Sequence, residues 1–211
     1  MVSWCCVRIF ALPCRAEIVA GRFDEAVAAI DAANADDPNQ IVVRGELRPK
    51  ELAHAELMTE WVQHLDPEAT EAQLLAARAH HLRRWSSPRS SQPEGRAGYL
   101  RWRSALRKQH AAEVAGLLVA AGYDEPTVSR VQCIIRKEGL GSDPQVQVHE
   151  DALCLVFLET QLATTTDALG DDKMVAVIGK TAAKMSPAGL ACVTDLPMRS
   201  HDRALIARAL A

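Results

Sequence analysis

The sequence predicts an all-α fold, a single helical bundle with at most a short strand pair near residues 40–47. Apolar residues recur at steps of three and four through most of the 211 residues, which is the spacing of one face of an α-helix. Residues that start and stop helices separate these segments. The composition is 48% hydrophobic and 24% charged, which is enough apolar material for one sizeable core.

The expected helices combine this period with capping residues. They span approximately residues 23–34, 49–64, 70–84, 96–121, 124–139, 143–168, 171–185 and 200–211. Thr70 and Gln73 form a capping box for the third of them, and Gly122 follows the end of the long fourth helix. Residues 86–95 contain two prolines and four serines, so we expect a loop there.

Residues 1–21 are interpreted as an N-terminal extension, and residues 22–211 as one helical domain. The extension is apolar but lacks a basic cluster, so a degenerate signal peptide is only the alternative interpretation. No stretch approaches the roughly 18 apolar residues of a membrane span, and we expect no membrane partner. The six cysteines include no CxxC pair, which favours a reduced, cytoplasmic chain.

Four expected helices each carry one residue of metal-ligand type within the apolar stripe. These residues are His54, His81, His110 and Asp151, and His80 lies next to His81 but turned about 100° from its face. An unpaired carboxylate among leucines is costly, so Asp151 predicts a buried partner or a metal. A lone inward His is commonly a hydrogen-bonded core residue, but four such residues favour a shared metal site. Imidazole and carboxylate ligands suit Zn, Fe, Mn or Ni.

Glu150 is adjacent to Asp151 and is the candidate catalytic acid or base. The alternatives are a half-exposed acid and a partner that orients a metal-bound histidine. The remaining histidines, His64, His149 and His201, show no comparable convergence and are expected on the surface.

Residues 78–110 contain nine Lys or Arg and one acidic residue, although the whole chain has a net charge of −3. Guanidinium groups bind phosphate or carboxylate through paired hydrogen bonds. The candidate substrate-binding residues are Arg84, Arg89, Arg96, Tyr99, Arg103 and Lys137. A solvated helix face and a nucleic-acid surface with aromatic stacking are the alternatives. Because the rest of the chain is acidic, we expect a small anionic substrate that contains phosphate.

The order of the ligand-type residues resembles that of the HD-domain superfamily. His54 would match the first His of its motif, His80 and His81 its HD doublet, and Asp151 its final Asp. The sequence departs from the motif at His81, where the doublet has Asp. The resemblance implies a bundle of HD-domain type and metal-dependent phosphohydrolase chemistry.

A more specific resemblance covers the chain from about Arg22 to the end. The strings "RPKELAHAELMTEWV", "RAHHLRRWSSPR", "PEGRAGYLRWR" and "EDALCLVFLE" resemble the family called domain of unknown function 4202, whose name carries no activity. We therefore expect a metal-dependent hydrolase acting on a small phosphate-bearing substrate such as a nucleotide. An HD-like non-haem di-iron oxygenase and a non-catalytic nucleotide- or RNA-binding module are the alternatives. The sequence leaves the oligomeric state open.

Overall fold

The computed structural model describes residues 21–211, so the expected N-terminal extension lies, except for Gly21, outside the described residues. The main elements are α1 (Arg22–Ala35), β1 (Gln40–Val43), β2 (Glu46–Pro49), α2 (Lys50–Leu65), α3 (Glu71–Arg78), α4 (Gly95–Ala120), α5 (Glu125–Arg136), α6 (Pro144–Thr160), α7 (Leu162–Leu169), α8 (Asp171–Ala182), α9 (Pro187–Cys192) and α10 (Ser200–Leu210). Short 3₁₀ turns span Arg84–Ser86, Arg89–Ser91 and Val193–Asp195. The expectation of an all-α fold with a short strand pair is confirmed.

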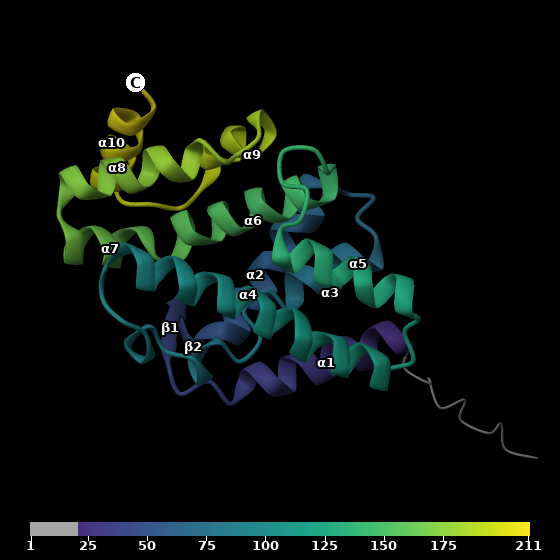
Figure 1. Ribbon diagram of the computed structural model, residues 1–211. Coiled ribbons are helices and arrows are strands. Elements are labelled where there is room, and N and C mark those ends of the chain that lie inside the picture. The colour runs from purple at the N-terminus through teal and green to yellow at the C-terminus, as the bar shows by residue number, and fades with distance from the viewer. Residues whose placement is uncertain (1–20) are drawn as a thin grey trace, which may run out of the picture.

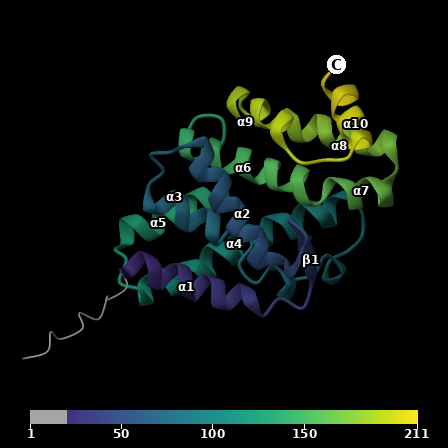
Figure 2. The same cartoon turned by 180° about the vertical axis from the view of Figure 1, so that it is seen from behind.

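Helix α6 separates two groups of helices. Figure 1 shows α8, α9 and α10 on one side of α6, and α1 to α5 on the other. The view from behind places α2 in front of α4 (Figure 2). Helix α2 packs against α1, α3 and α6, and α5 packs against α3 and α4. Helices α2, α3 and α6 all contact one another and therefore surround a common interior.

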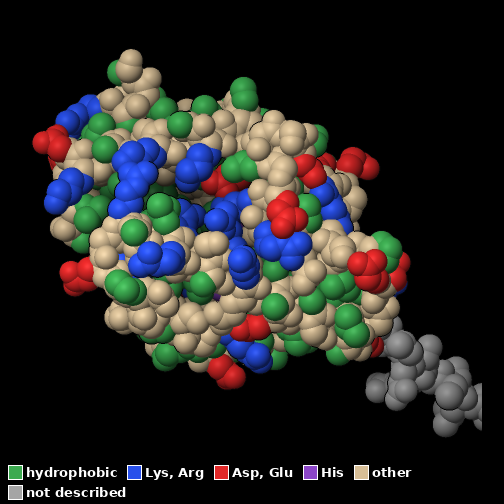
Figure 3. All heavy atoms as spheres, in the orientation of Figure 1, with side chains coloured by type: hydrophobic (Ala, Val, Ile, Leu, Met, Phe, Trp, Pro, Cys, Tyr) green, Lys and Arg blue, Asp and Glu red, His purple; other side chains and the backbone are tan. Residues whose placement is uncertain are grey.

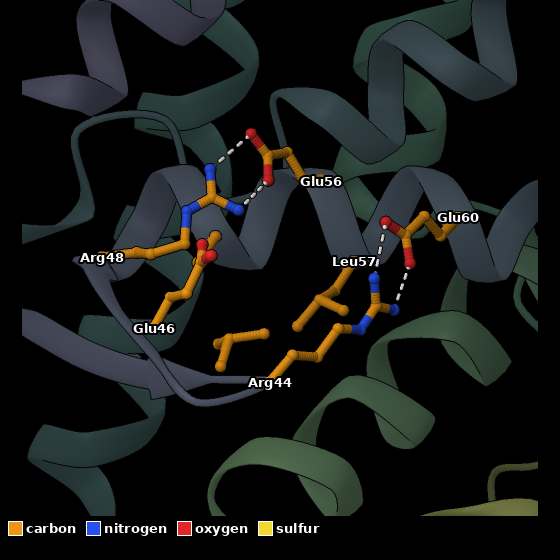
Figure 4. A pocket seen from close by; sticks show the side chains of 8 residues that line it. Arg44, Glu46, Arg48, Glu56, Leu57 and Glu60 are labelled. Atoms are coloured by element: carbon orange, nitrogen blue, oxygen red, sulfur yellow. Dashed lines mark hydrogen bonds and ion pairs between the residues drawn. The ribbon is translucent and has the colours of Figure 1, made fainter.

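The strand pair is a hairpin attached to α2. β1 and β2 are antiparallel and turn at Arg44 and Gly45, which both have positive φ (51° and 86°), as a two-residue hairpin turn of the common type requires. Arg44 donates to Glu60 at 2.5 Å, and Arg48 donates to Glu56 at 2.5 and 2.8 Å. Figure 4 shows these two pairs at the edges of a pocket between the hairpin and α2. They hold the hairpin against the middle of α2, the helix that carries two residues of the site near its start.

Two helix boundaries differ from the expectation. The helix expected over residues 70–84 ends at Arg78, and the chain then turns until Arg83, which adopts left-handed dihedrals (φ 50°). The helix expected over residues 143–168 is interrupted at Gln161. There the Thr160 hydroxyl donates back to the Val156 carbonyl at 2.7 Å, a contact that commonly bends helices. Helix α9 was not expected at all.

Candidate metal centre

Glu51 and His54 project from one face of α2. They are three residues apart, so their side chains are neighbours on the helix surface, and they are 3% and 5% exposed. The Glu51 backbone N–H donates to Asp37 Oδ2 at 2.9 Å. Asp37 therefore supplies the acceptor that the first turn of a helix needs, and it anchors this end of α2.

His80 and His81 both reach His54 because α3 ends before them. On a continuous helix their rings would diverge by about 100°, but here they lie in the turn after Arg78. The ring centroid of His54 is 4.1 Å from that of His81 and 6.1 Å from that of His80. Asn34 holds the turn in place by accepting the Arg83 N–H at 3.1 Å.

His110 of α4 and His149 of α6 complete a cluster of five rings. The centroid of His110 lies 5.9 Å from that of His81, and the centroid of His149 lies 4.7 Å from that of His80. His149 Nε2 and His80 Nδ1 are hydrogen-bonded at 2.7 Å. The expectation that His149 is a surface residue is wrong, since it is 1% exposed. Helix α6 is buried on most of its faces. An apolar stripe in its sequence therefore does not separate buried from exposed positions, and His149 could not be recognised as buried.

Three side chains of this cluster could hold a metal ion. Glu51, His54 and His81 each offer a ligand atom, and these atoms lie within 4.8 Å of one another. Glu51 Oε2 and His81 Nδ1 are 3.1 Å apart, close to the roughly 3.4 Å between two ligands at tetrahedral zinc distances. Among residues 21–211, neither ring nitrogen of His54 has a hydrogen-bond partner, and neither does Nε2 of His110. Buried polar atoms are rarely left unpaired, so these nitrogens favour a bound ligand.

The histidines of the cluster are neutral at neutral pH. Burial lowers the pKa of His54 and of His110 to about 4, and that of His149 to about 3. Burial also lowers the pKa of His80 and His81 well below the usual value. A neutral imidazole keeps a nitrogen lone pair free, which is the form that binds metal.

Cations border the cluster on the side of α4. Arg84 Nη1 is 3.8 Å from Glu51 Oε1, and the Arg84 guanidinium lies 5.0 Å from the Trp102 ring centre. Lys137, which directly follows α5, forms a buried ion pair with Glu150 of α6. Figure 3 shows Lys and Arg side chains gathered around a hollow between α4 and the layer of α8 and α9.

The structure does not bring Asp151 to the histidines. Its carboxylate accepts the Ser186 N–H at 2.8 Å, the Ser186 hydroxyl at 2.5 Å and the Gln147 amide at 2.9 Å. Residues two apart on a helix point about 200° away from each other, so with His149 facing the cluster, Asp151 faces α9. The expectation of a buried partner was sound, but the partner is Ser186, and the carboxylate beside the histidines is that of Glu51.

Several other candidate residues lie outside the metal-capable group. Arg89 donates to the carbonyls of Gln92 and Pro93, both at 2.9 Å, and so closes its own loop. Arg96 and Tyr99 are exposed, and the Arg103 guanidinium lies 5.8 Å from the Tyr99 ring centre. Glu150 contacts Lys137 and not the ligand atoms of the metal-capable group.

Besides His149, the sequence reasoning missed Glu51. A Glu in the first turn of a helix is common, because it interacts favourably with the positive end of the helix dipole. Its spacing of three from His54 was the available signal, since a Glu-x-x-His pair presents both side chains on one helix face, as it does in helical bundles that bind metals.

Fold and site together define an all-α protein with a buried cluster of histidines and one glutamate that could hold a metal ion. A family model described as "Domain of unknown function (DUF4202)" matches residues 24–206, and the chain belongs to this family. The comparisons with curated proteins and with solved structures found no match. Within residues 21–211, no helix combines the length and hydropathy needed to cross a membrane.

Proposed function

We propose that the protein is a metal-dependent hydrolase acting on a small phosphate-bearing substrate such as a nucleotide. Glu51, His54 and His81 hold one transition metal ion of the Zn, Fe, Mn or Ni class, and His110 is the adjacent candidate for a further ligand. The observation that carries the proposal is His54, whose two buried ring nitrogens have no partner in the part of the chain that the structure describes, although it lies against His81 and Glu51.

A divalent ion at these residues would supply Lewis acidity and an activated water. The protein side chains then have two further tasks. Glu51 and His54 fix the ligand geometry through their rigid positions on α2, and Arg84 offers a guanidinium to a phosphate oxygen beside the ligands. His149 orients His80 through their mutual hydrogen bond, in the way that outer partners orient residues around metals.

A distant relationship to the HD-domain superfamily remains part of this proposal. A His on one helix and a His doublet at the end of the next occur here within an all-α bundle. The doublet lacks its Asp, and Glu51 places a carboxylate 3.1 Å from His81, the residue that stands in its place. We propose that Glu51 substitutes for that missing ligand.

Metal analysis of protein purified without added metal or affinity tag tests the ligand set. The parent should contain about one equivalent of transition metal per chain, and Glu51→Gln, His54→Gln and His81→Gln should each lose most of it. His64→Gln is the matched control, because His64 is exposed on the same helix. Retention of metal in all three variants contradicts the proposed ligands.

Hydrolysis of phosphate esters and nucleotides by the metal-loaded protein tests the activity. The same three variants should fall to the background rate, and the His64→Gln control should match the parent. Bound iron with oxygen consumption and no hydrolysis would identify the oxygenase alternative. A metal-free protein whose nucleotide or RNA binding weakens steeply with salt would identify the binding module.

A further inference from the structure

Lys137 is a buried cation on an unusual backbone. It follows the last turn of α5 with φ 60° and ψ 38°, the left-handed region that few residues other than glycine adopt. Its side chain is only 6% exposed. Strained backbone and buried charge are both enriched at functional sites, so this position calls for an explanation beyond helix termination.

Two lysines, Lys137 and Lys184, converge on the carboxylate of Glu150. Glu150 Oε2 accepts the Lys137 ammonium, and Glu150 Oε1 lies 3.6 Å from Lys184 Nζ. Burial is the largest cause of the lowered pKa of Lys137, and the charge and hydrogen bond of Glu150 act in the opposite direction. Glu150 neutralises only one of these charges, so the group keeps an excess of positive charge. The Lys184 side chain is 42% exposed, so the group is open to solvent on that side.

This group adjoins the histidine cluster, because Glu150 follows His149 in α6 and His149 is hydrogen-bonded to His80. After burial, which is the largest cause, the charge of Arg84 lowers the pKa of His54, His81 and His110. The charge of Lys137 likewise contributes to the lowered pKa of His80, His81 and His149. Both cations act on the pKa of His81, and His81 is partly exposed.

We propose that Lys137 and Lys184 form a second anion subsite, so that the substrate carries two phosphate groups, as a diphosphate or a bisphosphate ester does. One phosphate lies at the metal centre beside Arg84, and the other lies at this subsite. Glu150 occupies the subsite when substrate is absent. The two-phosphate assignment rests on the proposed function, whereas the subsite itself does not require the metal.

The subsite is tested by titrating the full-length, metal-stripped protein with methylene bisphosphonate, after the chelator has been dialysed away. Lys184→Gln should weaken binding by about fivefold, and Lys180→Gln, the same substitution at an exposed lysine of α8, should not. Glu150→Gln should strengthen binding by about fivefold, because it removes the anion that competes with the probe. Lys184 is partly exposed, so its variant is expected to fold.

Equal affinities of the parent, Lys184→Gln and Glu150→Gln would overturn the subsite and leave a purely structural ion-pair network. The two-phosphate class is tested with metal-loaded protein, which should bind the bisphosphonate at least about tenfold more tightly than inorganic phosphate. Equal affinity for the two probes would overturn that class. Absence of metal or hydrolysis in the parent would defeat only the proposed function, since the first titration is done without metal.

Discussion

At Asp151, hydrogen bonds from Ser186 and Gln147 satisfy a carboxylate that is 2% exposed. A Cβ added at Gly189 would lie 2.7 Å from the Asp151 Cγ, so α9 can approach α6 this closely only with glycine at that position. Because Ser186 also caps α9 by accepting the Gly189 N–H at 3.1 Å, Asp151 holds the start of α9 on α6.

Replacing Asp151 with Asn should therefore reduce stability without removing metal. The amide keeps one acceptor but loses the charge that strengthens the Ser186 bonds, so the free energy of unfolding should fall by about 1–3 kcal/mol. Urea unfolding and metal analysis of the same preparation measure both effects. Loss of the metal at unchanged stability would instead place Asp151 at the metal centre.

Among the helices, α4 shows how closely an element of the site is fitted to its neighbouring loop. A Cβ added at Gly98 would lie 1.9 Å from the Pro93 carbonyl oxygen. One turn later, Trp102 Nε1 donates to the Ser87 carbonyl at 2.9 Å, and the Trp102 ring contacts Arg84. The start of α4 thus positions the cation beside Glu51.

Gly98→Ala should destabilise the protein by about 2–4 kcal/mol, since the clash is with backbone and cannot be relieved by a side-chain rotation. Gly116→Ala on the same helix is the matched control, because nothing lies within 4 Å of its added Cβ. There the substitution should stabilise by about 0.5–1 kcal/mol through helix propensity. Thermal unfolding of both variants measures the contrast, and equal effects would contradict the close packing at Pro93.

The sequence predicts elements where local chemistry decides them. The Thr70–Gln73 capping box forms as expected, and Asp124 caps α5 by accepting the Thr127 N–H at 3.1 Å. The early end of α3 was not predictable in this way, because it depends on the tertiary contact between Arg83 and Asn34.

The candidate site was predicted only in part, for the same reason. His54, His81 and His110 were identified from inward-facing stripes, which is local information. His149 and Glu51 were missed because their roles depend on packing: α6 is buried on most faces, and Glu51 faces a turn that lies 30 residues further along the chain.

Across the whole molecule, five neutral histidines make folding sensitive to acid. An unfolded histidine has a pKa of about 6.5, whereas burial lowers the pKa of His54 and His110 to about 4 in the folded protein. Between these values the unfolded chain binds protons that the folded chain excludes, so stability falls as the pH is lowered.

Metal-free protein should accordingly lose stability between about pH 6.5 and pH 4. Urea unfolding at pH 7, 6 and 5 measures the loss, which should be smaller in His110→Gln and unchanged in His64→Gln. A free energy of unfolding that stays constant from pH 7 to pH 5 would show that the cluster is hydrated or charged in solution.

The separation of Glu51 and His81 by 30 residues along the chain has a mechanical consequence. With the proposed ligands, a bound ion ties the first turn of α2 to the turn after α3 and works as a removable cross-link. A covalent link across a loop of this length lowers the chain entropy of the unfolded state, which raises the free energy of that state by about 3–4 kcal/mol in the polymer model. The metal–ligand bonds would have to break before α2 and α3 separate. The ion would therefore slow unfolding and lengthen the lifetime of the folded chain.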